Sequence, residues 1–243
     1  MTSHTLKYNR VLLKLSGEAL NGKTSQALDP AVLNTIVDEI IEVANLGLQI
    51  AIVIGGGNLF RGAALEKIGI DRITGDQIGM LATLINALAL RDAIEKRNKV
   101  AKIMSSISVG SIATLFERYK AVRYLKKGYI VIFAGGTGNP LVSTDSAASL
   151  RGIEIDADLL LKATHVDGIF SADPKKDKHA ILYSQLSYQK ALEDELGIMD
   201  LAAFSQCRDY NLPIQVFNIQ SKNVLRDIIQ GKSRGTLVSQ KGE

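Results

Sequence analysis

The sequence predicts an α/β protein in which a mostly parallel sheet lies between layers of helices. Short β-rich runs alternate with helical patterns over nearly all of the 243 residues. Several of these runs are apolar at consecutive positions, as in residues 50–54, and a strand has this pattern when both faces of its sheet are covered. The repeated βαβα order therefore favours one open α/β sandwich.

Seven segments are predicted to be strands because they are rich in apolar and β-branched residues. They are residues 11–15, 48–54, 100–104, 129–133, 159–163, 214–217 and 236–239. No internal repeat, low-complexity tract or linker separates them, so we expect residues 1–243 to form a single domain.

Two longer helices have clear sequence signals. Asp29 is an N-cap residue followed by Pro30 at the first helical position, and Gly47 is expected to end this helix. Residues 76–97 predict a long helix whose apolar positions cover more than one stripe. Such a helix is either deeply buried or part of a subunit interface.

Shorter helices are expected where capping residues and glycines bracket helical patterns. Asn58 is expected to cap the first of them, and Gly152 and Gly231 are expected to end the other two. The three segments are residues 58–69, 143–152 and 221–230.

Composition limits the class of protein. The net charge is +4, no basic block accompanies aromatic residues, and nucleic acid is therefore not the expected partner. Cys207 is the sole cysteine, which fits a reducing compartment. The start of the chain is polar, and no uninterrupted apolar run approaches the roughly 18 residues that span a bilayer. We expect a soluble cytoplasmic protein.

Three strand ends share one design, in which glycines or small polar residues lead towards a helix. They are residues 14–17, 55–58 and 135–139. Glycine lets backbone N–H groups approach a ligand, and the following helix N-terminus favours an anion. The other interpretation is that these glycines only make tight turns. Their number and the cations among them favour a phosphate site at the carboxyl ends of the strands.

Three cations have positions that suit phosphate. Lys14 ends the first strand, Arg61 follows the Gly-Gly-Gly-Asn segment, and Lys162 lies within an otherwise apolar strand. An arginine fork fits phosphate oxygens, and a lysine supplies a point charge. Alternatively, the lysine amines reach water along packed stems and Arg61 is a solvated helix residue. Asp76, Asp145 and Asp200 are in turn explained by helix capping or by the helix dipole.

Several other chemistries are excluded by their missing motifs. Gly231-Lys232-Ser233 has Arg226 where a Walker loop needs glycine, and no Gly-x-Gly-x-x-Gly follows a strand. The three histidines lack metal-ligand spacing, and no Gly-x-Ser-x-Gly elbow is present. Phosphoryl transfer suits what remains, because it needs mainly positioning and cationic stabilisation from the protein.

Seven segments, in order along almost the whole chain, resemble the bacterial UMP kinase family, which belongs to the amino acid kinase superfamily. They are residues 14–20 (KLSGEAL), 53–62 (VIGGGNLFRG), 75–83 (GDQIGMLAT), 136–148 (GTGNPLVSTDSAA), 151–158 (RGIEIDAD), 161–174 (LKATHVDGIFSADP) and 199–204 (MDLAAF). The resemblance implies a three-layer α/β/α fold and a ring-shaped homohexamer. It also implies transfer of a phosphoryl group from ATP to UMP with Mg²⁺, giving ADP and UDP.

The resemblance also assigns residues to the two nucleotides. Those implied to contact ATP are Lys14, Leu15, Ser16, Gly17, Gly57, Arg61, Thr164, Phe170 and Asp173. Those implied to contact UMP are Gly56, Asp76, Thr137, Gly138, Asn139, Pro140, Leu141, Val142, Ser143 and Thr144.

Catalytic roles follow from the same resemblance. Lys14, Arg61 and Lys162 are expected to stabilise the transferring phosphoryl, and Asp145 and Asp200 are expected to orient the cations and the substrate loop. A phosphate oxygen of UMP is already a nucleophile, so no general base is expected. Mg²⁺ is expected on ATP oxygens, with no protein metal ligands.

The sequence departs from the family pattern in two places. Many members have a glycine-rich stretch with an aromatic residue where residues 23–29 stand here, and that loop is associated with activation by GTP. The resemblance implies inhibition by UTP, whereas this departure argues against activation by GTP. Phe170 stands where many members have tyrosine, which keeps a ring for packing and removes a hydroxyl contact.

Two other functions stay open from the sequence. One is a kinase of the same superfamily that acts on carbamate or on an acyl carboxylate, against which the nucleotide-type segment 137–144 argues. The other is a protein of the same fold that binds a nucleotide or an anion without turnover, against which Lys14, Arg61 and Lys162 argue.

Overall fold

The centre of the molecule is a nine-stranded sheet in the order β4-β3-β5-β2-β1-β6-β8-β9-β7. The structure is a computed structural model that describes residues 6–22, 26–172, 174 and 176–242. Along this order, the first seven strands, from β4 at the edge to β8, pair parallel with their neighbours. Strand β9 pairs antiparallel with β8 and parallel with β7. The strands are β1 (Arg10–Leu15), β2 (Gln49–Ile54), β3 (Ala101–Ser105), β4 (Thr114–Leu115), β5 (Ile130–Ala134), β6 (Leu159–Thr164), β7 (Gln185–Ser187), β8 (Ile214–Asn218) and β9 (Thr236–Ser239).

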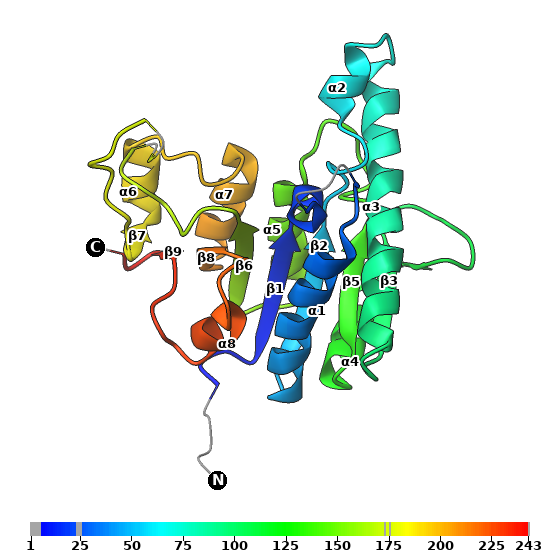
Figure 1. The fold of residues 1–243 in the computed structure, drawn as a ribbon, viewed down its shortest axis with the longest axis horizontal. Helices are drawn as coiled ribbons and strands as arrows, with labels where there is room; N and C mark the ends of the chain where they lie inside the picture. The colour runs from blue at the N-terminus through cyan, green and yellow to red at the C-terminus, as the bar shows by residue number, and fades with distance from the viewer. Residues whose placement is uncertain (1–5, 23–25, 173, 175, 243) are drawn as a thin grey trace.

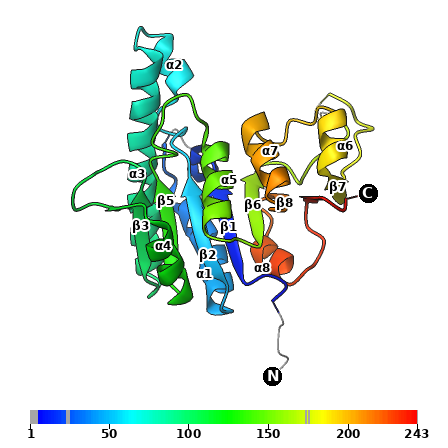
Figure 2. The same ribbon diagram turned by 180° about the vertical axis from the view of Figure 1, so that it is seen from behind.

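Helices cover both faces of this sheet, so the predicted three-layer α/β/α fold is confirmed. Figure 1 shows α1, α3 and α8 in front of the strands, and the reverse view in Figure 2 brings α4, α5 and α7 forward. Helix α6 lies beside β7 at one end of the sheet. The helices are α1 (Pro30–Asn45), α2 (Gly62–Glu66), α3 (Arg72–Glu95), α4 (Arg118–Lys126), α5 (Thr144–Glu154), α6 (Tyr188–Glu193), α7 (Leu201–Asp209) and α8 (Val224–Ile229), with a 3₁₀ turn η1 (Gly17–Leu20).

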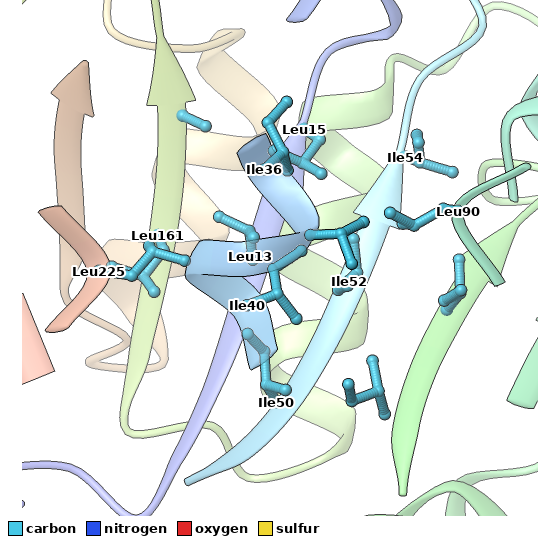
Figure 3. Packing of buried hydrophobic residues seen from close by; sticks show 14 of the residues in the cluster. Leu13, Leu15, Ile36, Ile40, Ile50, Ile52, Ile54, Leu90, Leu161 and Leu225 are labelled. Carbon is cyan, nitrogen blue, oxygen red and sulfur yellow. The ribbon is translucent and has the colours of Figure 1, made fainter. Parts of the chain in front are cut away.

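Alternate residues of the central strands enter two separate cores. Leu13 and Leu15 of β1 pack with Ile52 of β2 and Ile40 of α1 beneath the first helix layer (Figure 3). Leu12 belongs to the core on the opposite face. Both faces of β1 are therefore covered, which explains its uninterrupted apolar sequence.

All seven predicted strands are present, with ends shifted by one residue at most, whereas β4 and β7 were not predicted. Both are very short, and β4 pairs with a single neighbour at the edge of the sheet. The apolar pattern of a two- or three-residue strand is too brief to detect.

The predicted helix ends were less accurate. Helix α3 begins at Arg72, because the Asp71 carboxylate caps it by accepting from the N–H of Thr74 at 3.1 Å. Asp76 is thus in the second turn, and its expected position at the helix start was wrong. Gly152 does not end α5, which continues to Glu154. The missing side chain at Gly152 makes room for Leu212, whose Cδ2 would lie 2.8 Å from a Cβ there.

Two of the shorter helix predictions also need correction, whereas the cap at Asp29 and Pro30 at the first position of α1 are confirmed. Asn58 does not cap a helix; its side-chain amide donates to the carbonyl of Ala27 at 2.7 Å, and α2 follows Arg61 instead. Helix α8 begins at Val224, after Asn223 in a left-handed conformation with φ 60°. The helices α4 and α6 and the turn η1 were not predicted.

Helix α3 is long and apolar enough to cross a membrane by length and composition alone. In this structure it packs on β2, β3 and β5 and against α1, as a core helix does. Its upper part extends past the strand ends together with α2 (Figure 1). This overhang forms one wall of the region where the central strands end.

Candidate active site at the strand ends

Lys14 and Lys162 occupy the same register on the neighbouring strands β1 and β6. On each strand the flanking apolar residues belong to the α1 side, so alternation turns both lysines towards the α5 side. Asp145, in the first turn of α5, lies over them. Its Oδ1 is 2.8 Å from the Lys14 Nζ, and its Oδ2 is 2.6 Å from the Lys162 Nζ.

Burial and charge set the protonation of this cluster. Burial alone raises the pKa of Asp145, but the two lysines outweigh it and hold the carboxyl pKa below its ordinary value. Burial lowers the pKa of Lys162, as does Lys14, and the attraction of Asp145 opposes them only in part. Two lysines share one carboxylate, so this ion-paired group has an excess positive charge that can attract a phosphoryl group.

Asp200 connects the start of α5 to the start of α7. Its Oδ1 caps α7 by accepting from the N–H of Ala203 at 2.9 Å and accepts from the Ser146 hydroxyl at 3.1 Å. It also accepts from the hydroxyl of Ser143, the N-cap of α5. Asp200 thereby fixes the helix turn that carries Asp145. The capping role considered for Asp200 and this positioning role coexist.

A first cleft of about 370 Å³ lies between α2, α3 and the segment 136–144. Asp76 joins two of its walls, because its Oδ2 accepts from the backbone N–H of Leu141 at 2.8 Å while Arg72 contacts its Oδ1 at 3.2 Å. Leu141 has a left-handed φ of 64°, which this bond helps to hold. The lining residues are Gly56, Gly57, Phe60, Arg61, Gly62, Arg72, Asp76, Gly79, Met80, Thr83, Gly136, Thr137, Asn139, Leu141, Val142, Ser143 and Thr144.

Most residues expected at UMP therefore surround this cleft, together with two expected at ATP. Gly57 and Arg61 lie on the first cleft, and Arg61 forms an ion pair with Glu18 of η1. Gly138 and Pro140 belong to the same segment but are not among the lining residues.

The glycines at the strand ends have two different uses. A Cβ at Gly56 would lie 2.6 Å from the carbonyl oxygen of Gly79, and one at Gly17 would lie 2.7 Å from the nitrogen of Gly57. These two glycines let the loops pack on each other and on α3. At Gly136 a Cβ would meet nothing within 4 Å, but its φ of 57° favours glycine.

A second cleft of about 540 Å³ opens on the other side of Lys162. Thr164 and Phe170, both expected at ATP, line it together with the loop between α6 and α7. Asp173 lies outside the described residues. The lining residues are Lys162, Thr164, Val166, Gly168, Ile169, Phe170, Ala172, Pro174, Glu195, Leu196, Gly197, Ile198 and Val216.

The Lys14–Asp145–Lys162 cluster lies at the junction of the two clefts. Thr144, the residue before Asp145, lines the first cleft, and Lys162 lines the second. Leu15 ends β1 with its side chain in the core, so only its backbone can face a ligand there.

Comparison with known proteins identifies the family. The sequence matches the amino acid kinase family over residues 9–218. It is 60% identical over 233 residues to the uridylate kinase of Coxiella burnetii, covering 96% of each chain, and 52% identical over 234 residues to that of Ectopseudomonas mendocina, covering 96% of this chain and 95% of the relative. The chain belongs to the amino acid kinase family.

Solved structures of that family have the same fold. The UMP kinase from Bacillus anthracis superposes with a TM-score of 0.94 at 44% identity and covers 96% of this chain and 97% of its own. The UMP kinase from Ureaplasma parvum has a TM-score of 0.91 at 31% identity and covers 96% of this chain and 100% of its own.

Sequence reasoning missed several polar groups of this amino acid kinase. Arg72 lines the first cleft, and its spacing of four residues before Asp76 is a signal that could have indicated it. Arg151, which is buried, donates to the Ser106 hydroxyl at 3.0 Å, and that hydroxyl donates to the carbonyl of Gly136 at 2.7 Å. No local pattern predicts this contact, because its three residues come from distant parts of the chain.

Metal-binding side chains are not clustered in the part of the chain that the structure describes. No group of three or more His, Cys, Asp or Glu residues there could hold a metal ion. Asp145, the acidic group at the junction of the clefts, is already paired with two lysines.

Proposed function

We propose that this amino acid kinase is a UMP kinase, which transfers the γ-phosphoryl group of ATP to UMP and gives ADP and UDP. The lysine pair at the junction of two clefts is the observation that carries this proposal. Phosphoryl transfer needs two bound nucleotides, in-line geometry and cations at the transferring group. The near full-length relatives named uridylate kinase support UMP as the acceptor.

In this proposal the first cleft binds UMP and the second binds the base of ATP. Asp76 holds the backbone of segment 137–144 against the acceptor, Arg72 supplies a guanidinium group for its phosphate, and Arg61 supplies one to the transferring phosphoryl. Phe170 and Ile169 offer apolar surface to the adenine. Lys14 and Gly17 lie at the strand end where the phosphates of ATP would reach the lysine pair.

Lys14 and Lys162 act on the transferring group in this proposal. Asp145 keeps their amines at one point, so the positive charge is in place before the reaction and needs little reorganisation. A UMP phosphate oxygen attacks the γ-phosphorus while the bond to the bridging oxygen of ADP breaks. No side chain has to remove a proton from that nucleophile.

Mg²⁺ belongs to the proposal as an ion carried by the ATP phosphates. The described residues at the junction supply lysines, which suit the phosphate oxygens that would carry the ion. When bound, Mg²⁺ would add further neutralisation of phosphate charge.

We further propose a single cytoplasmic domain that assembles as a homohexamer and is inhibited by UTP. The exposed apolar residues of α3 support an interface between subunits. Activation by GTP is not part of the proposal, because residues 23–29 lack the glycine-rich, aromatic-containing stretch of many family members. Residues 23–25 lie outside the described residues.

A coupled assay of ADP release with UMP, CMP, dTMP and AMP as acceptors tests the function. We expect UMP to give the largest kcat/KM; ADP release no faster than without acceptor would contradict it. A carbamate kinase or a carboxylate kinase would instead release ADP with carbamate or with a carboxylic acid as the acceptor.

We also expect Arg61→Ala to reduce kcat/KM at least about tenfold, as for loss of a transition-state cation. Near-normal turnover would remove Arg61 from the phosphoryl site.

A further inference from the structure

One wall of the second cleft is an arm of the chain between β6 and β7, whose two paired sides are residues 169–171 and 181–183. Two backbone bonds join its two sides: the N–H of Ser171 donates to the carbonyl of Ile181, and the N–H of Tyr183 donates to the carbonyl of Ile169, both at 2.9 Å. Phe170 and Leu182 form an antiparallel bridge between them. Ile169 and Phe170, on one side of this arm, line the cleft.

The base of the arm contains an inserted side-chain hydroxyl. In a regular antiparallel pair, Ile169 and Tyr183 would exchange two backbone bonds. Only the bond from Tyr183 to Ile169 is direct. On the other side the N–H of Ile169 donates to the Thr236 Oγ1 at 2.8 Å, and this hydroxyl donates to the carbonyl of Tyr183. Thr236 therefore completes the pair from a different strand.

Thr236 is itself held in place on β9. It pairs with Val216 of the antiparallel neighbour β8 and has no exposed surface. Gly235 before it has φ 72°, and a Cβ there would lie 2.0 Å from the carbonyl oxygen of Val216. The Arg234 carbonyl accepts from the Gln215 amide at 2.6 Å.

The Arg234 side chain adds another anchor, because its Nη2 lies 2.6 Å from a carboxylate oxygen of Asp227. These contacts hold the Thr236 hydroxyl in a fixed position beside the arm. At the arm itself, Gly168 fits closely, since a Cβ there would lie 2.6 Å from the Thr236 Oγ1.

We propose that Thr236 is a positioning residue for the ATP-side cleft. Its hydroxyl sets the register of the arm at Ile169 and Tyr183 and thereby the placement of Ile169 and Phe170 against the nucleotide base. Thr236 is not among the residues that line the cleft, so it acts through the arm. This inference rests on the proposed assignment of the second cleft to ATP.

Thr236→Val and Thr236→Ser separate the hydroxyl from the shape of the side chain. Valine keeps the volume but leaves the buried N–H of Ile169 without its acceptor, whereas serine keeps the hydroxyl. We expect Thr236→Val to raise KM for ATP at least about fivefold, because the unsatisfied N–H of Ile169 displaces Ile169 and Phe170 from the base, and to leave KM for UMP within about twofold. Thr236→Ser should stay within about twofold of the parent for both. Thr35→Val, which removes an exposed hydroxyl on α1, is the matched control and should change neither.

An unchanged KM for ATP in Thr236→Val would overturn the inference. An equal rise in the KM values for ATP and UMP that is found in both Thr236→Val and Thr236→Ser would also overturn it, because that pattern indicates general loss of structure. If Thr236→Val does not fold, Thr236→Ala is compared with Thr236→Ser by the same criteria.

Direct ATP binding measured by calorimetry separates this test from that of the proposed function. Weaker ATP binding by Thr236→Val alone supports the inference even if the parent protein fails to phosphorylate UMP. Equal ATP affinity of the parent protein and Thr236→Val contradicts it whatever the acceptor.

Discussion

At the residue scale, strand alternation explains why two lysines can lie inside an apolar sheet. Lys14 and Lys162 follow buried leucines on β1 and β6. Because side chains alternate between the two faces of a sheet, both lysines point towards the first turn of α5. The lysines alone would repel each other, and Asp145 makes their approach favourable. The family resemblance implied that Asp145 orients the cations. That one carboxylate contacts both lysines was not predicted, because it depends on the relative register of two strands.

Asp145→Asn tests this balance through stability. The variant keeps the size of the side chain but leaves two largely buried lysine amines without their carboxylate. We expect the free energy of unfolding at pH 7 to fall by about 3–5 kcal/mol, as for a broken buried pair. Urea denaturation measures this. Asp209→Asn, which affects an exposed pair with Arg208, should change it by less than about 1 kcal/mol.

The pH dependence of the same pair has a definite sign. The folded protein holds the pKa of Asp145 below its ordinary value, so the ionised carboxyl contributes stability above the unfolded pKa. That contribution is lost as the pH falls from about 4 through the folded pKa. The stability difference between the parent protein and Asp145→Asn should therefore be constant above about pH 5 and shrink in acid. A difference that grew in acid would contradict the ion-pair account.

At the element scale, the sequence predicted strands better than helices for a physical reason. A strand covered on both faces is marked by its own apolar residues, as in residues 50–54. A helix end depends on which of several candidate residues caps it, and Asp71 rather than Asp76 caps the start of α3. The glycine-rich strand ends were predicted as phosphate sites, and several are needed for packing between loops. Only the assembled structure distinguishes these two uses.

Glu39 joins helices α1 and α8 and gives an element-scale prediction. Its carboxylate is largely buried and accepts from the N–H groups of Asn223 at 2.6 Å and Leu225 at 3.3 Å. Burial raises the pKa of Glu39, the two backbone donors lower it, Glu42 raises it and Arg226 lowers it. The net pKa lies above its ordinary value of 4.5, so the charged form is disfavoured in the folded protein.

Removing this titration should change the pH profile of stability. A raised folded pKa contributes stability that is present below the unfolded pKa and lost as the pH rises through the folded pKa. Relative to Glu39→Gln, the parent protein should lose stability from about pH 4.5 upwards and then level off. Urea denaturation at several pH values checks this, with the exposed Glu193→Gln as the control. A difference independent of pH would contradict the role of Glu39.

At the scale of the whole molecule, α3 belongs both to the core and to the surface. One side of it packs on the sheet, while Leu81 and Ile85 are 51% and 47% exposed. The sequence left burial and a subunit interface as alternatives for this helix. Its position at the edge of the α1 layer is compatible with both, because a helix of this length has more apolar surface than one sheet can cover.

The final prediction concerns assembly through that exposed side. We expect sedimentation to give the protein a mass near six times 26.3 kDa, and Leu81→Asp with Ile85→Asp to reduce it, because desolvating two carboxylates in an apolar contact is unfavourable. Tyr210→Asp, at an exposed aromatic residue ending α7, should leave the mass unchanged. A monomeric parent protein would contradict the hexamer. A hexamer that persisted in the double variant would place its interfaces away from Leu81 and Ile85.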